Sequence, residues 1–135
     1  MKRGLGKTMV RWLIALAMIA SGVLHFVATD RYAQIVPAYL PAHTLLVQLS
    51  GVAELLGGLG LLVPHPALRR WASYGLIALL VAVFPANVNM ALHDIAVNGK
   101  HLPTTFLWLR LPLQLVLVWL TWWCTAPTGS VSART

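Results

Sequence analysis

The chain has 135 residues, enough for one compact domain and too few for two. It is 59% hydrophobic and only 10% charged, whereas soluble globular proteins average about 45–50% and about 25%. Together with a mean hydropathy of +0.76, this excludes a disordered tail and an ordinary soluble enzyme. The net charge of +7 does not indicate nucleic acid, because the basic residues lie at the ends of apolar runs and form no stripe.

Four apolar segments are long enough to cross about 30 Å of bilayer hydrocarbon, which takes roughly 20 helical residues each. In chain order they cover residues 9–28, 43–63, 71–92 and 105–123. The first could instead be a cleaved signal peptide, but its apolar run continues to full spanning length. Residues 124–135 are expected to form a short polar tail. The sequence therefore predicts a single all-α domain, a bundle of four transmembrane helices.

The connectors between these segments are rich in turn-forming residues. Residues 30–41 contain two prolines, which keep the helix from continuing, and two tyrosines, which can lie at headgroup level. The second connector contains Pro64-His65-Pro66, and the third contains the stretch from Asn98 to Pro103. Each predicted helix therefore has a defined end.

The distribution of Lys and Arg predicts the orientation of the bundle. Four basic residues lie near the N-terminus and two in the second connector, whereas the first and third connectors have only Arg31, opposed by Asp30, and Lys100. Cytoplasmic loops carry an excess of Lys and Arg, so both termini should face the cytoplasm of a bacterial inner membrane. Tryptophans, which favour membrane interfaces, agree with this topology. Those expected near the inner interface are Trp12, Trp71, Trp119, Trp122 and Trp123.

Few polar side chains lie inside the predicted spans. A charge at the centre of a membrane helix costs roughly 2.5–3.5 kcal/mol, so such residues are expected to face protein or water. Counting the helical rise from the outer ends places His25, Asn87 and Arg110 in an outer layer and Glu54 and Gln114 near the midplane. We interpret these five residues as candidate ligand-binding residues.

Helical spacing indicates which polar residues share a face. Arg110 and Gln114 are four residues apart, as are Glu54 and Gly58. We expect an outward-opening pocket with Glu54 and Gln114 at its floor and Arg110, Asn87 and His25 at its rim. Several glycines make the second helix thin enough for close packing.

Structural roles are the alternatives for the same residues. Glu54 and Arg110 could form a buried ion pair, although an axial offset of about 8 Å would stretch it and favour a bridging water or ligand. His25 could extend to the surface as an interfacial histidine. Asn87 and Gln114 could serve only as hydrogen-bonding links between helices.

The sequence gives little support for a metal site or for catalysis by a nucleophilic side chain. The five histidines show no ligand spacing, so we expect no metal site. No GxSxG motif occurs, and no complete catalytic constellation can be named. Cys124 is the single cysteine, which excludes an intramolecular disulfide and a CxxC pair.

Four motifs resemble the DoxX family of small bacterial membrane proteins, and the likeness covers nearly all of residues 9–123. The motifs are Gly22-Val-Leu-His25-Phe, Gly51-Val-Ala-Glu54-Leu-Leu-Gly-Gly58, Phe84-Pro-Ala-Asn87-Val-Asn89-Met and Leu109-Arg110-Leu-Pro112-Leu-Gln114. The resemblance implies a four-helix membrane bundle, similar to the methylamine-utilisation protein MauE and distantly to quinone-linked thiol oxidoreductases. It also implies association with quinone oxidoreductase complexes, thiosulfate oxidation or oxidative-stress resistance. The chain lacks the paired cysteines of the thiol-oxidising relatives, which removes dithiol-to-quinone electron transfer.

These observations lead to three functional hypotheses. The first is an accessory subunit of a membrane redox system that binds a quinone headgroup or similar small amphiphile. The second is a structural or assembly protein whose polar layer only holds helices together. The third is a small transporter, which would require a homo-oligomer because four short helices enclose little volume.

Overall fold

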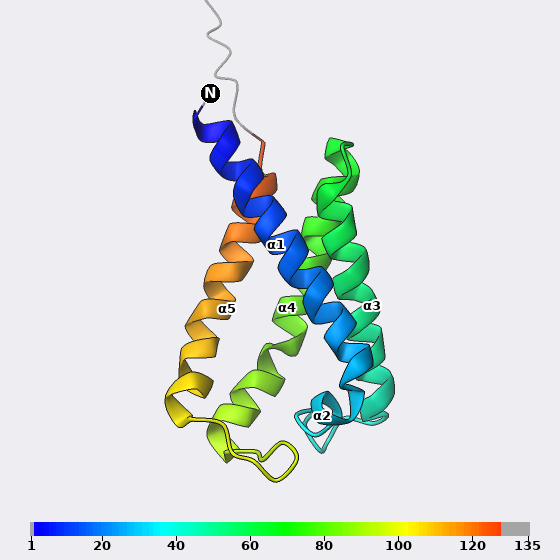
Figure 1. Cartoon of the computed structure of the whole chain (residues 1–135), viewed down its shortest axis with the longest axis vertical. Helices are drawn as coiled ribbons and strands as arrows, with labels where there is room; N and C mark the ends of the chain where they lie inside the picture. Colours follow the sequence, from blue (N-terminus) through cyan, green and yellow to red (C-terminus); the bar gives the residue numbers. More distant parts are fainter. Residues whose placement is uncertain (1, 128–135) are drawn as a thin grey trace, which may run out of the picture.

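The computed structural model describes residues 2–127 and contains four long helices and one short one (Figure 1). The elements are α1 (Lys2–Val27), α2 (Thr29–Ala33), α3 (His43–Leu62), α4 (Pro66–His93) and α5 (Thr104–Thr125). The four long helices are apolar and long enough to span a bilayer. The predicted all-α bundle of four transmembrane helices is thus confirmed, and the chain is a multi-pass membrane protein.

The helix ends differ from the prediction in places with a physical cause. Helix α1 begins at Lys2 rather than residue 9, and α4 begins at Pro66 rather than residue 71. Proline is well suited to a first helical turn, because its missing N–H has no partner there in any case. Helix α5 continues through Thr125, so residues 124 and 125 do not belong to a polar tail, and residues 128–135 lie outside the described part of the chain.

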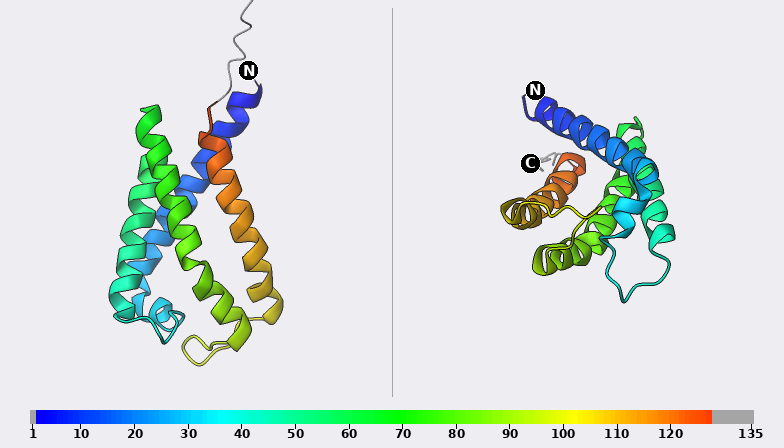
Figure 2. Two further views of the ribbon diagram at one scale, coloured as in Figure 1. Left: turned by 180° about the vertical axis from the view of Figure 1, so that it is seen from behind. Right: turned by 60° about the horizontal axis from the view of Figure 1, so that its bottom comes forward.

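The long helices form a ring in which each one contacts two neighbours (Figure 2). The order around the ring is α1, α3, α4 and α5, and α5 contacts α1 to close it. The start of α1, the α3–α4 turn and the end of α5 lie at one end of the bundle, here called the basic end (Figure 1). The opposite end, formed by α2 and the connectors 34–42 and 94–103, is called the loop end.

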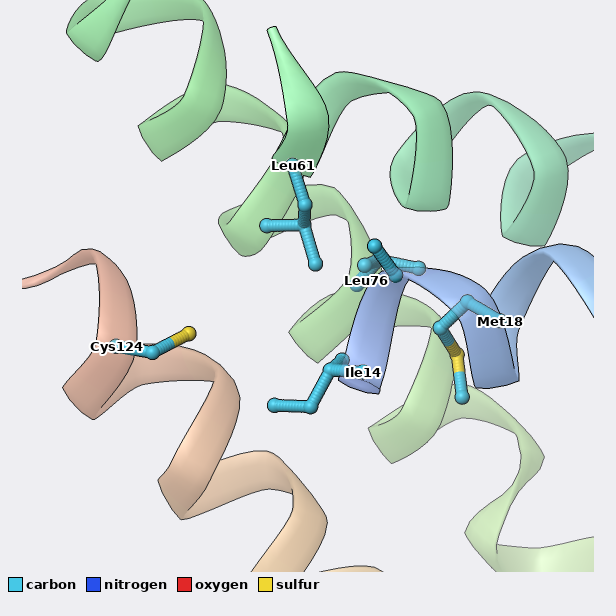
Figure 3. Packing of buried hydrophobic residues seen from close by; sticks show 6 residues of the cluster. Ile14, Met18, Leu61, Leu76 and Cys124 are labelled. Carbon is cyan, nitrogen blue, oxygen red and sulfur yellow. The ribbon is translucent and has the colours of Figure 1, made fainter. Parts of the chain in front are cut away.

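The apolar core is concentrated toward the basic end, where all four helices meet. Its buried members come from every long helix of the ring (Figure 3); they are Ile14, Ala15, Met18, Leu61, Leu76 and Cys124. Toward the loop end α1 and α5 diverge, so the ring separates into an α1–α3 pair and an α4–α5 pair (Figures 1 and 2). A second small core joins α4 to α5 there, built on Met90, Ala91 and Leu107.

Glycines bring α3 into close contact with both of its neighbours. A Cβ atom on Gly58 would lie 2.9 Å from the carbonyl oxygen of Ala15 in α1. A Cβ on Gly57, on the adjoining face, would lie 2.4 Å from the side chain of Leu76 in α4. Small residues at helix contacts allow this approach in lipid, where the hydrophobic effect does not drive helices together. The predicted packing role of these glycines is confirmed.

Replacing Gly58 by alanine should weaken the α1–α3 contact, because the new methyl group meets backbone atoms that cannot rotate away. We expect a loss of about 1–3 kcal/mol in the free energy of unfolding. The control is Gly75→Ala on α4, where no atom lies within 4 Å of the added Cβ, so that variant should be neutral or slightly more stable. Thermal unfolding in detergent measures both. Equal midpoints for the two variants would contradict the close-packing interpretation.

Candidate functional site

The first part of the candidate site is a pair between α1 and α3 near the loop end. Glu54 is only 9% exposed and lies on the face of α3 that packs against α1. His25 Nδ1 lies 3.1 Å from Glu54 Oε2 and 2.8 Å from the carbonyl oxygen of Ser21. A carbonyl oxygen only accepts, so Nδ1 donates its hydrogen to Ser21. Within residues 2–127, Glu54 Oε2 is thereby left buried without a hydrogen-bond donor.

Tyr32 of α2 extends this pair toward the centre of the bundle. Its ring stacks on His25 with 4.2 Å between ring centroids and 22° between planes. The pKa of Tyr32 is raised above its ordinary value by burial of the phenol and also by the charge of Glu54, whereas the Arg110 guanidinium opposes the rise. The charges of both Glu54 and Arg110, which lie on different helix pairs, therefore act on the Tyr32 phenol.

The second part is a chain of hydrogen bonds between α4 and α5. Arg110 Nη2 donates to Asn87 Oδ1 at 3.0 Å, and Asn87 Nδ2 donates to Gln114 Oε1 at 2.7 Å. Gln114 Nε2 in turn donates to the Leu80 carbonyl oxygen at 2.6 Å. Arg110 also lies 3.6 Å from the sulfur of Met90. Every amide in this chain has a partner, which suits a dry interior.

The grouping differs from the predicted one. Arg110 and Gln114 share a face as expected, but Gln114 joins the outer residues Asn87 and Arg110 instead of forming a midplane layer with Glu54. Glu54 and Arg110 form no direct ion pair, because α3 and α5 occupy opposite corners of the ring. His25 pairs with Glu54 and does not extend to the surface as an isolated interfacial histidine.

Two surface cavities lie away from these five residues. One, of about 570 Å³, is lined by residues 42–45 and Gln48. The other, of about 290 Å³, is lined by residues 26–31 and Asn98. The outward-opening pocket predicted around the five residues is neither of these two cavities.

At the loop end, the connector 34–42 of one helix pair contacts the connector 94–103 of the other. Gln34 Nε2 donates to Asn98 Oδ1 at 3.0 Å, and the Asn98 backbone N–H donates to Gln34 Oε1 at 2.9 Å. The neighbouring Ile35 packs against the Met90 core of α4 and α5. Asn98 and Gly99 both have positive φ, 52° and 72°, which shapes the turn that presents Asn98 to Gln34. The two helix pairs are therefore linked at the loop end, beyond the polar residues.

Sequence reasoning missed two polar groups. Tyr32 was interpreted only as an interfacial aromatic, although it follows His25 by seven residues, close to two helical turns. Near the basic end, Ser73 is fully buried, donates to the Thr121 carbonyl oxygen at 3.0 Å and accepts from Thr125 at 2.9 Å. Short hydroxyl side chains carry little signal in a membrane helix, because they can also bond to their own backbone.

A family model described as Domain of unknown function (DUF8561) matches residues 14–125. The chain belongs to the DUF8561 family. The matched region of DUF8561 runs from α1 to the end of α5, so it contains both polar clusters and Tyr32. No curated protein and no solved structure matches the chain.

The Asn87 amide is the central link of the α4–α5 cluster, so Asn87→Leu should remove the partners of Arg110 Nη2 and Gln114 Oε1, while Gln114 Nε2 keeps the Leu80 carbonyl oxygen. We expect a loss of about 1–3 kcal/mol in the free energy of unfolding. Asn89 lies two residues after Asn87 on α4, and its side chain makes no hydrogen bond to any described residue. Asn89→Leu therefore serves as the control. A double-mutant cycle with Gln114→Leu should give a coupling of about 0.6–1.7 kcal/mol. A coupling near zero would show that the link does not hold the helices.

The raised pKa of Tyr32 predicts a specific alkaline response. The folded protein holds the phenol proton to a higher pH than the unfolded chain, so this stabilisation is complete below about pH 10 and is lost as the pH rises through the folded-state pKa. Tyr32→Phe should therefore show a shallower fall of the unfolding temperature above about pH 10 than the wild type. Tyr39→Phe, at a ring that is 75% exposed, should follow the wild-type curve. Parallel curves for all three proteins would contradict the buried placement of Tyr32.

Proposed function

We propose that this chain is a DoxX-like membrane protein that binds a quinone headgroup or similar small amphiphile between its two helix pairs and serves a membrane redox system as an accessory subunit. The observation that carries the proposal is the buried, donor-free oxygen of Glu54. A buried polar atom without a partner is rare in folded proteins and calls for a functional or solvent explanation. A ligand hydroxyl would supply the missing donor.

The residues around Glu54 suit the two redox forms of a quinone. A quinol hydroxyl can donate to Glu54 Oε2, and a quinone carbonyl can accept from the Arg110 guanidinium on the opposite helix pair. Tyr32 lies within electrostatic range of both and offers an aromatic ring. Glu54 can take up the proton that a quinol hydroxyl releases, and His25 Nδ1, held by Ser21, lies 3.1 Å from that carboxylate. The chain has no paired cysteines, so the electrons would come from the partner complex.

The proposed orientation has both termini in the cytoplasm of a bacterial inner membrane. Lys and Arg residues are concentrated at the basic end, which contains the start of α1 and the α3–α4 turn. The loop end, with the polar residues beneath it, would then face the outer side of that membrane. A ligand would approach the site from the outer leaflet or the outer aqueous phase.

A purely structural role is the second candidate, and the α4–α5 cluster favours it. Arg110, Asn87 and Gln114 already satisfy one another and the Leu80 carbonyl without any ligand. On this view, substitutions would change only the stability or assembly of the protein. The Glu54 oxygen distinguishes the two candidates, since a structural cluster gains nothing from leaving it without a donor.

The test is quinone binding by the full chain purified in mild detergent. Extraction and mass spectrometry measure the quinone retained, and titration with a soluble ubiquinone analogue measures affinity. We expect Glu54→Gln and Arg110→Gln each to weaken binding about tenfold or more, since each removes a charged hydrogen-bonding group worth about 1.5–3 kcal/mol.

Two variants at the loop end serve as matched controls. Asp94→Asn and Arg31→Gln make the same changes of charge at exposed positions and should bind quinone like the wild type. Quinone binding that is unchanged in folded Glu54→Gln and Arg110→Gln would refute the proposed site. A wild-type protein that binds no quinone, while the same variants lower its unfolding temperature, would support the structural role instead.

A further inference from the structure

The basic end contains three cations that gather around the last turns of α5. Lys7 and Arg11 are four residues apart on α1 and share one face of that helix, and Lys7 contacts the end of α5, while Arg69 of α4 lies against the end of α3. Arg11 and Arg69 are also close enough to repel each other. The acidic residues of the chain are Asp30 and Asp94, at the loop end, and Glu54, which pairs with His25. The three cations therefore have no carboxylate partner among the described residues.

Two of the cations are held in place by backbone carbonyls. Lys7 Nζ donates to the Ala126 carbonyl oxygen at 3.1 Å and lies 5.5 Å from the centre of the Trp123 ring. Arg69 donates through Nε and Nη2 to the Val63 carbonyl oxygen, at 3.3 and 2.9 Å, at the end of α3. Its Nη1 takes part in neither bond. These contacts position the two charges and leave each with donors to spare.

Arg11 differs from both. Its Nε is buried and has no hydrogen-bond partner within residues 2–127. A buried guanidinium N–H without an acceptor, next to a second guanidinium, is unfavourable unless an anion supplies the acceptor. The exposed neighbour Trp12 and the tryptophans of α4 and α5 place this group at the level of the membrane interface, because Trp prefers headgroup depth. They are Trp12, Trp71, Trp119 and Trp122, between 48% and 72% exposed.

We propose that Arg11, Arg69 and Lys7 form a binding site for a phosphate group at the basic end of the bundle, with Arg11 as its central donor. A guanidinium fork matches two phosphate oxygens, and the lysine adds a point charge. Phosphate of an anionic lipid headgroup is present at this depth, and basic clusters between membrane helices bind such headgroups. This site uses none of the residues of the proposed quinone site and is independent of it.

The experiment measures binding of phosphatidylglycerol to the full chain in detergent, by native mass spectrometry and by the shift in unfolding temperature. Arg11→Gln should lose about tenfold in affinity for this lipid and most of the thermal shift. Arg70→Gln is the matched control, because it makes the same change of charge at an exposed position beside Arg69, and it should bind like the wild type. Arg11→Lys, which keeps the net charge but loses the fork, should weaken binding severalfold.

Each outcome decides the assignment. Equal losses in Arg11→Gln and Arg70→Gln would show diffuse attraction and overturn the site, as would a wild type that binds neither the lipid nor inorganic phosphate. If Arg11→Gln does not fold, lipid binding by Arg11→Lys that equals the wild type would overturn the role of the guanidinium. Stabilisation of the wild type and of Arg70→Gln by inorganic phosphate alone, absent in Arg11→Lys, would support the site with free phosphate as its ligand.

Discussion

The close contact between α1 and α3 is the constraint on which the polar interior depends. Glycines on α3 allow the backbones to approach until a Cβ on Gly58 would lie 2.9 Å from the Ala15 carbonyl oxygen. At this separation Glu54 can lie 3.1 Å from His25 and face the bundle interior, which is where carboxylates in membrane helices are tolerated. A bulkier α3 would push the helices apart and leave the carboxylate facing lipid or water.

The ring arrangement then determines which polar groups can meet. Adjacent helices share hydrogen bonds, so His25 pairs with Glu54 across α1 and α3, and Asn87 pairs with Gln114 across α4 and α5. Helices at opposite corners make no close backbone contact, which keeps Glu54 and Arg110 from pairing directly. Opposite charges are thus held in one interior without neutralising each other directly. Such an arrangement suits a molecule that can contact both.

Much of the fold could be predicted from the sequence, because the relevant signals are local. Hydropathy over about 20 residues located the four spans, and the i, i+4 spacing correctly placed Arg110 and Gln114 on one face. Which helices lie next to each other could not be predicted from such local signals. The rise along each helix gives depth but not the neighbour around the ring, so depth alone grouped Gln114 with Glu54 instead of with Asn87. Tyr32 was missed because it lies past the predicted end of the first span, where the seven-residue spacing from His25 was not read as a continued helical face.

The two hydrogen bonds between Gln34 and Asn98 hold the helix pairs together at the loop end more weakly than the core holds them at the basic end. Exposed amide bonds contribute only about 0.5–1.5 kcal/mol each, far less than the four-helix core near the basic end. Thermal fluctuations would therefore part the bundle from the loop end first, with the packed opposite end as the pivot.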